Sequence, residues 1–147
     1  MKYGARCVVE LALIVVVSAP VVIHAEDQDV VDYRQHIMRT MGEQEAAIGM
    51  ILEQKAPADN FATHIRILAV TAATAKKAFE PKVPGGKAKP EVWAQWPDFA
   101  RRLDALAAAT DDLAKIAASG GVAAVGAKVS GALTCKSCHD IYLVEKK

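Results

Sequence analysis

The stretch "DVVDYRQHIMRTMGEQEAAIGMILEQ", residues 29–54, sets the fold class of this chain. Its apolar residues recur at steps of three and four, and the stripe comprises Val30, Tyr33, Ile37, Met41, Ile48 and Leu52, widened by Met38 and Ile51. This period is typical of an amphipathic helix that buries one face. The pattern ends before Pro57, so we predict a helix over residues 29–54.

Three further segments show the helical period. The second predicted helix opens at Asp59 or Asn60, both good N-caps, and ends near Phe79. Residues 80–91, "EPKVPGGKAKPE", break helix with three prolines and two adjacent glycines and predict the longest loop. The third helix opens at Pro90 and closes at "SGG", residues 119–121, and the fourth runs from about Val122 to Leu143. The predicted apolar face of the second helix comprises Phe61, Ile65, Leu68, Ala72, Ala75 and Phe79. That of the third comprises Trp93, Trp96, Phe99, Leu103, Leu106, Leu113 and Ile116, and that of the fourth comprises Val125, Val129 and Leu133.

No segment shows a competing strand pattern, so we expect an all-α fold. Four helices with two short connections and one longer one fit an antiparallel, up-down-up-down four-helix bundle. The chain has 147 residues, which is room for about one domain. We therefore predict a single four-helix-bundle domain at residues 26–147.

The N-terminal residues are typical of a targeting segment. Two basic residues precede an apolar run at residues 11–23, and Ala25 precedes the polar stretch "EDQD". We predict a signal peptide over residues 1–25 and export to the periplasm. The run is shorter than the roughly 18 to 20 apolar residues that span a bilayer, and Pro20 interrupts it. We therefore expect no stable membrane insertion after cleavage.

The motif "TCKSCHD", residues 134–140, lies near the C-terminus. Cys135, Cys138 and His139 stand at i, i+3 and i+4, so they project from one side of the predicted fourth helix. The pattern C-x-x-C-H indicates covalent haem attachment, in which two thiols add to the porphyrin vinyl groups and the neighbouring imidazole ligates iron. We predict one covalently bound haem c.

Two other uses of the thiols remain open. In an oxidising compartment a nearby pair forms a disulfide unless something else takes the thiols, and Cys135 would then be linked to Cys138 in a haem-free helical module. A zinc site needs four protein ligands, whereas this cluster offers three, with His36 and His64 as the only other histidines of the predicted mature chain. A thioredoxin-type redox pair is not expected, because it would need a strand before the motif and the sequence predicts none there.

The predicted mature chain contains the motifs "YRQHIM" (33–38), "GGKAKPEVW" (85–93) and "CKSCHDIY" (135–142). With these motifs the chain as a whole resembles the class II c-type cytochromes, meaning cytochrome c′ and its low-spin relatives. The resemblance implies that Cys135 and Cys138 form the thioethers and that His139 is the proximal iron ligand. It also implies that Arg34 and Gln35 lie at the haem edge, with Arg34 near a propionate.

The resemblance further implies that the residue four positions after Arg34 decides the chemistry, and here it is Met38. A Met thioether trans to His gives a low-spin centre of raised potential, which suits electron transfer. A side chain that does not bond leaves iron five-coordinate and open to nitric oxide or carbon monoxide. Met41, one turn on, is a rival ligand whose other role is core packing.

These observations predict a periplasmic one-electron carrier that meets redox partner proteins, with a five-coordinate gas-binding protein as the alternative. Leu143 stands where the family usually has a basic residue, and this departure favours the carrier. Relatives occur as dimers through their first two helices, and small residues such as Gly49 permit a homodimer here. The dispersed charges, with a net charge of +1, indicate no nucleic-acid partner. The sequence shows no carboxylate pair and no Ser/His/Asp arrangement placed for hydrolysis, so we do not expect an enzyme.

Overall fold

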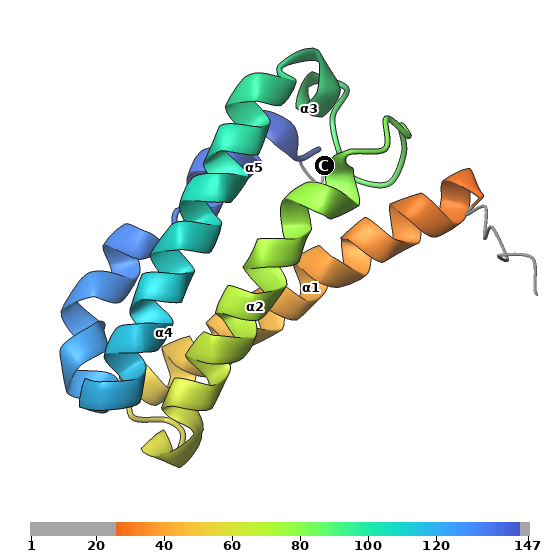
Figure 1. Cartoon of the computed structure of the whole chain (residues 1–147). Coiled ribbons are helices and arrows are strands. Elements are labelled where there is room, and N and C mark those ends of the chain that lie inside the picture. The colour runs from red at the N-terminus through yellow and green to blue at the C-terminus, as the bar shows by residue number, and fades with distance from the viewer. Residues whose placement is uncertain (1–25, 145–147) are drawn as a thin grey trace, which may run out of the picture.

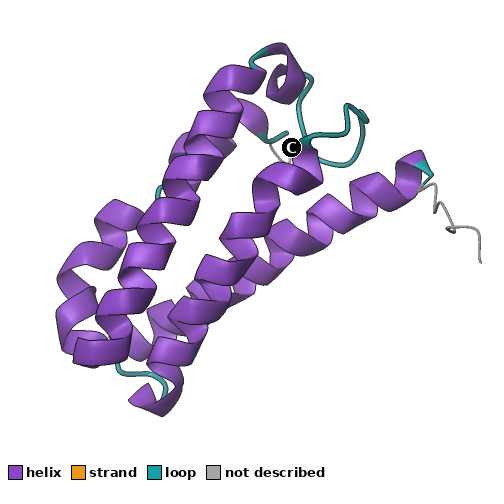
Figure 2. Ribbon diagram, viewed as in Figure 1, coloured by secondary structure: helices purple, strands orange, loops and turns teal. Residues whose placement is uncertain are grey.

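The computed structural model describes residues 26–144, so the predicted signal peptide at residues 1–25 lies outside the described residues. The elements in chain order are α1 (Asp27–Leu52), the 3-10 helix η1 (Ala58–Asn60), α2 (Phe61–Phe79), α3 (Glu91–Ala94), α4 (Trp96–Ala132) and α5 (Cys135–Tyr142). Between residues 26 and 144 only isolated bridges, such as Ala88 with Leu143, pair extended backbone. The prediction of an all-α fold is confirmed (Figure 2).

The helices form the predicted antiparallel four-helix bundle (Figure 1). The first two bundle helices are α1 and α2. The third is the first arm of α4, and the fourth is the second arm of α4 continued by α5. The two arms of α4 meet at Gly121, whose φ of 57° and ψ of −150° lie in a region almost restricted to glycine. The reversal predicted at "SGG" is thus present, built on this one residue.

Two predicted helices are interrupted. The third is broken at Gln95 (φ −115°, ψ 36°), so that α3 is a separate short helix before α4. Pro97 explains this break, because it has no N–H to continue the hydrogen-bond ladder from α3 into α4. The fourth is broken at Leu133 (φ −88°, ψ 79°) and Thr134 (φ −86°, ψ 33°). The cysteine motif therefore lies on its own short helix, α5.

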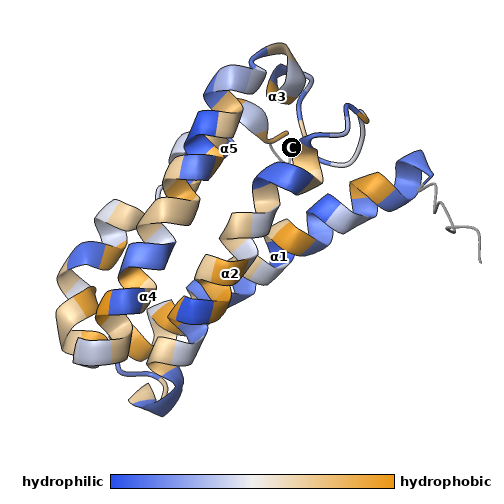
Figure 3. Cartoon of the chain, in the orientation of Figure 1, coloured by the Kyte–Doolittle hydropathy of each residue, from blue (hydrophilic) through white to orange (hydrophobic). Residues whose placement is uncertain are grey.

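The core follows the predicted faces most closely in α2. Every residue predicted for that face is buried, from Phe61 to Phe79. Figure 3 shows the same periodicity as alternating apolar and polar bands along α1 and α2. In the first half of α1 the predicted stripe is wrong by one position, because Val31 and Arg34 are buried whereas Tyr33 is 55% exposed. This half of α1 packs against the loop after α2, and the apolar period of α1 alone does not show which residues that loop covers.

One described stretch, Trp96–Tyr142, is long and apolar enough in composition to cross a membrane. Core helices of soluble proteins meet the same criterion, so this is weak evidence of a span. The stretch also turns back on itself at Gly121. The predicted absence of membrane insertion stays a prediction.

Candidate functional site

A pocket of about 390 Å³ lies between α1, α2, α4 and α5. Its volume is within the range of roughly 300 to 1,000 Å³ that is usual for small-molecule and cofactor sites. Apolar side chains form most of its lining, among them Met41, Leu68, Phe79, Val92, Phe99, Leu103, Leu106, Leu133 and Leu143. Such walls exclude water from whatever the pocket holds and lower the local dielectric.

The three motif residues of α5 all line this pocket. Cys135 and Cys138 are half-buried and their thiols are free, and His139 is exposed. Since α5 starts at Cys135, the spacing of i, i+3 and i+4 brings all three side chains to one side of a single short helix. The structure thus brings together two thiols and one imidazole at the same wall.

Burial raises the pKa of the Cys135 thiol to about 11, and the nearby Glu45 carboxylate adds to this shift by its charge and by a hydrogen bond. Both effects disfavour a thiolate. Cys135 is therefore a neutral thiol at physiological pH and a weak nucleophile in this fold. Glu45 itself was not singled out in the sequence, because only the tertiary structure brings α1 next to α5.

The residues predicted on α1 line the same pocket as the motif. Arg34, Gln35 and Met38 all border it, and Gln35 and Met38 are half-buried. Met41 also borders it but is only 8% exposed and belongs to the core cluster. Met38 therefore combines access to the pocket with a position one helical turn from Arg34, as the spacing predicted.

Arg34 fastens the loop after α2 onto α1. Its guanidinium donates from Nη1 to the Val83 carbonyl (2.6 Å) and from Nη2 to the Gly85 carbonyl (2.8 Å). It also lies over two aromatic rings, 5.7 Å from the Phe79 centroid and 5.0 Å from the Trp93 centroid. The side chain is only 2% exposed, and this burial lowers the pKa of Arg34. Arg34 is therefore a buried cation at the border of the pocket, and its guanidinium has five N–H donors in all.

Glycines let the same loop approach α1 closely. Gly86 has a φ of +60°, and a Cβ there would stand 3.0 Å from Gln35 Nε2 and 3.1 Å from a Val31 methyl group. Any side chain there would strain the backbone at this φ and would require Gln35 and Val31 to move by a few tenths of an ångström. The predicted loop at residues 80–91 is thus ordered, and Lys87 and Ala88 from it border the pocket.

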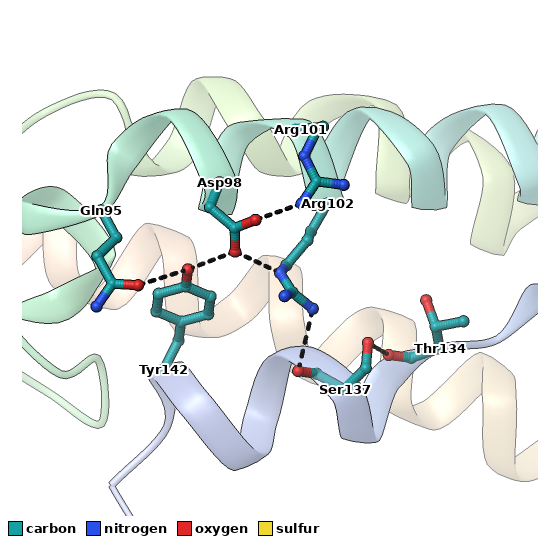
Figure 4. A network of polar contacts seen from close by, with 7 residues as sticks. All are labelled: Gln95, Asp98, Arg101, Arg102, Thr134, Ser137 and Tyr142. Carbon is teal, nitrogen blue, oxygen red and sulfur yellow. Dashed lines mark hydrogen bonds and ion pairs between the residues drawn. The ribbon is translucent and has the colours of Figure 1, made fainter.

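A polar network joins α4 to α5 beside the pocket (Figure 4). The Asp98 carboxylate accepts from Arg102 Nε at 2.6 Å, from the Tyr142 hydroxyl at 2.8 Å and from Arg101. Its pKa falls from the ordinary 3.8 to about 2, first because of the Arg102 hydrogen bond and then because of the one from Tyr142. Asp98 and Arg102 are i and i+4 on one helix, a signal that the sequence did contain.

The weaker candidates lie away from the pocket. His36 is exposed, and His64 is half-buried, with its Nδ1 2.9 Å from Gln44 Oε1. Trp93 donates its indole N–H to the Phe79 carbonyl at 2.9 Å, a packing role. Within residues 26–144 no group of three or more His, Cys, Asp or Glu side chains is arranged to hold a metal ion.

The groups around the pocket fit a covalently attached haem. Two thiols and an imidazole stand on one short helix, a thioether stands on another helix, and a buried guanidinium suits a carboxylate substituent. The apolar walls suit a large planar ring. Arg39 and Lys87 also border the pocket and were not predicted, since nothing in their local sequence distinguishes them from other solvated basic residues.

Comparison with known proteins gives concordant results. The family model described as Cytochrome C' matches residues 29–142. The chain is 32% identical over 133 residues to cytochrome c' of Alcaligenes xylosoxydans xylosoxydans, covering 83% of this chain and 98% of that protein. It is 31% identical over 140 residues to cytochrome c' of Rhodospirillum rubrum, covering 91% and 95%.

Solved structures agree in fold. A ferrous variant of cytochrome c prime from Alcaligenes xylosoxidans with bound NO superposes with a TM-score of 0.76 at 27% identity, over 84% of this chain and all of that one. A carbon-monoxide-bound variant of the same protein gives a TM-score of 0.75 at 27% identity, over 82% and 98%.

Proposed function

The chain belongs to the cytochrome c′ family, and from that premise we propose that it is a periplasmic monohaem cytochrome that carries one electron at a time. Membership makes it a protein with covalently attached haem c that carries electrons or binds small gases. The carrier role, the residue assignments and the location are our proposal.

The proposed attachment uses α5. Cys135 and Cys138 form the two thioethers, and His139 binds iron from the same helix, because all three side chains line one pocket wall. When bound, the haem supplies the one-electron redox change. The protein's part is to bury the group among apolar side chains and to present the imidazole from α5.

Met38 is the residue that we propose would bind the iron from the α1 side of the pocket. It reaches the pocket from α1, whereas His139 reaches it from α5, so that the two potential ligands come from different helices. Met38 is half-buried and more accessible from the pocket than Met41, which is buried in the core. A Met thioether together with a His imidazole raises the reduction potential of the iron, which suits electron transfer.

The observation that carries this proposal is the shared pocket: one apolar cavity is lined by Cys135, Cys138 and His139 on α5 and by Met38 on α1. Arg34 supports it as a buried cation at the pocket border, where a propionate would be neutralised. Gln35, next to Arg34 and half-buried, is the second residue we place at the haem edge.

A second function is favoured by the similar structures. The Alcaligenes cytochrome c prime variants were solved with nitric oxide and carbon monoxide bound. If the Met38 sulfur does not bond, the α1 side of the pocket is free for such a gas. The chain would then be a gas-binding cytochrome of the same fold.

The location follows from the predicted signal peptide at residues 1–25, which we propose is cleaved on export. Intact-mass measurement of the periplasmic protein tests cleavage and haem attachment together. A chain of the processed mass with no added haem would contradict the proposal and leave the haem-free module with a Cys135–Cys138 disulfide.

Met38→Ala separates the two functions. In the carrier, the oxidised wild type is low-spin with a methionine-to-iron absorption band, and the substitution removes that band and makes the iron high-spin. Met50→Ala is the matched control, because Met50 is on the same helix and 50% exposed. Loss of the band in Met41→Ala instead would reassign the ligand. High-spin spectra of the wild type in both redox states would reject Met38 as ligand and favour gas binding.

A further inference from the structure

The helix that carries the haem motif has little apolar anchoring of its own. Of its eight residues only Tyr142 is buried, Cys135 and Cys138 are half-buried, and His139 is exposed. The non-helical link at residues 133–134 separates α5 from α4, so the bundle helix does not hold α5 rigidly. The orientation of α5 must depend on a few specific contacts.

The first of these contacts is Tyr142. Its ring is 3% exposed and meets Phe99 edge-on, with centroids 5.0 Å apart. Its hydroxyl donates to Asp98 Oδ2 at 2.8 Å and lies 3.5 Å from Gln95 Oε1. The contact ties the C-terminal end of α5 to the first turn of α4.

The second contact runs through Arg102. Its Nε donates to Asp98 Oδ2 at 2.6 Å, and its Nη1 donates to the Ser137 carbonyl at 3.4 Å. Figure 4 shows both branches spreading from Asp98 to α5. The anchored residues, Ser137 and Tyr142, flank His139 in the sequence.

We propose that Asp98 is a positioning residue for His139. Through Tyr142 and Arg102 its carboxylate holds α5 at points on both sides of the imidazole, and so fixes how His139 is presented to the pocket. We name Asp98, Arg102 and Tyr142 the α5 latch. The inference rests on the proposed function, because it takes His139 as the iron ligand.

A carboxylate is required at the centre of the latch. Asp98 accepts from Arg101, Arg102 and Tyr142, and only an ionised carboxylate offers enough lone pairs and the charge to hold two guanidinium groups. An amide at this position keeps one acceptor oxygen and loses the charge. Asp98→Asn should therefore weaken the latch partially and Asp98→Ala should abolish it.

Other contacts keep α5 on the protein when the latch is removed. The Lys89 N–H donates to the Tyr142 carbonyl at 2.9 Å, and the Val144 N–H donates to the Lys87 carbonyl at 2.9 Å. These bonds hold the end of α5 to the loop and do not involve Asp98. Loss of the latch should therefore change the orientation of α5 without detaching it.

The test uses the haem-loaded protein with Asp98→Ala, Asp98→Asn and Tyr142→Phe. Tyr142→Phe keeps the aromatic packing and removes only the hydroxyl, so it is the variant that folds if Asp98→Ala does not. Asp112→Ala is the matched control, since Asp112 is an exposed α4 carboxylate paired with Lys115. The readouts are amide hydrogen exchange in α5 and the electron paramagnetic resonance spectrum of ferric iron, whose g values would follow the orientation of a bound imidazole.

We expect exchange in α5 to rise roughly tenfold in Asp98→Ala, because charge-assisted hydrogen bonds are lost, with exchange in α2 unchanged. We expect the g values to shift in the same variant, to shift less in Asp98→Asn, and to stay at wild-type values in Asp112→Ala. Faster exchange in α5 with unshifted g values would show that the latch has only a structural role, and would overturn the proposal. Unchanged exchange in α5 would overturn it as well.

Failure of the proposed function gives a different result. A wild type without covalent haem would remove the iron signal altogether and overturn the positioning role together with the haem assignment. A haem-loaded wild type whose latch variants leave the spectrum unmoved would overturn the positioning role alone.

Discussion

At the residue scale, Arg34 shows how one side chain serves both the fold and the site. A buried charge is unfavourable unless hydrogen bonds compensate it. Here the Val83 and Gly85 carbonyls compensate it, and the guanidinium also contacts the rings of Phe79 and Trp93. The same guanidinium borders the pocket. This explains why a residue that the apolar stripe left outside is among the most buried side chains of α1.

We predict that Arg34→Ala lowers the free energy of unfolding by about 2 to 4 kcal/mol, because two carbonyls lose charged donors and two aromatic rings lose the side chain that packs over them. Arg34→Lys should lose less, since an ammonium keeps the charge but cannot reach both carbonyls as a planar fork does. Urea unfolding measures both. Arg66→Ala, an exposed arginine on α2, is the control and should stay within about 0.5 kcal/mol of wild type. Equal stability of wild type and Arg34→Ala would show that the loop does not depend on this side chain.

At the scale of elements, the bundle depends on where its helices are interrupted. α4 becomes two bundle helices because Gly121 adopts a backbone conformation that other residues avoid. α5 becomes separate because the backbone leaves the helix at residues 133–134. The first interruption lets the chain return along the bundle, and the second lets the haem motif take an orientation of its own.

We predict that Gly121→Ala destabilises the protein by about 1 to 3 kcal/mol, the strain of an alanine held in this region. Gly131→Ala should have the opposite sign, because a Cβ there meets nothing within 4 Å and Gly131 lies in helix. We expect a gain of about 0.4 to 1 kcal/mol from the reduced entropy of the unfolded chain. Chemical denaturation of the two variants side by side checks both. If both substitutions shifted stability the same way, the conformation at Gly121 would not be the cause.

At the scale of the whole molecule, the pocket exists because four elements distant in sequence meet. α1 supplies Met38, α5 supplies the motif, and α2 and α4 supply apolar walls such as Phe79 and Phe99. The α5 latch then couples α4 to α5 through a carboxylate of low pKa. The integrity of the site is therefore linked to the charge state of Asp98.

We predict that stability falls in acid through Asp98. Its pKa is about 2 in the folded protein and 3.8 ordinarily, so the ionised form is favoured by folding. The stabilisation is complete above the ordinary pKa and is lost as the pH falls from about 4 towards 2. The stability difference between wild type and Asp98→Asn, measured by urea unfolding, should therefore be larger at about pH 5 than at about pH 2.5. A pH-independent difference for Asp98→Asn would refute the assignment.

Local sequence was enough for much of this protein. The period of three and four residues predicted the helices, because burial of one helix face selects that pattern directly. Pro and Gly predicted the loop at residues 80–91 and the reversal near Gly121, because they restrict or widen the backbone choices of a single residue. The spacing in "CKSCH" predicted that Cys135, Cys138 and His139 share one side of a helix.

Only the tertiary structure decided which residues meet across helices. Arg34 is buried because a distant loop supplies carbonyls to it, and Tyr33 is exposed although it fits the apolar stripe. Glu45 acts on Cys135, and Asp98 reaches α5, through contacts between segments far apart in the chain. The physical reason is that a periodic pattern records which face of a helix is buried, whereas the partners of a charged or polar side chain are set by the packing of whole helices.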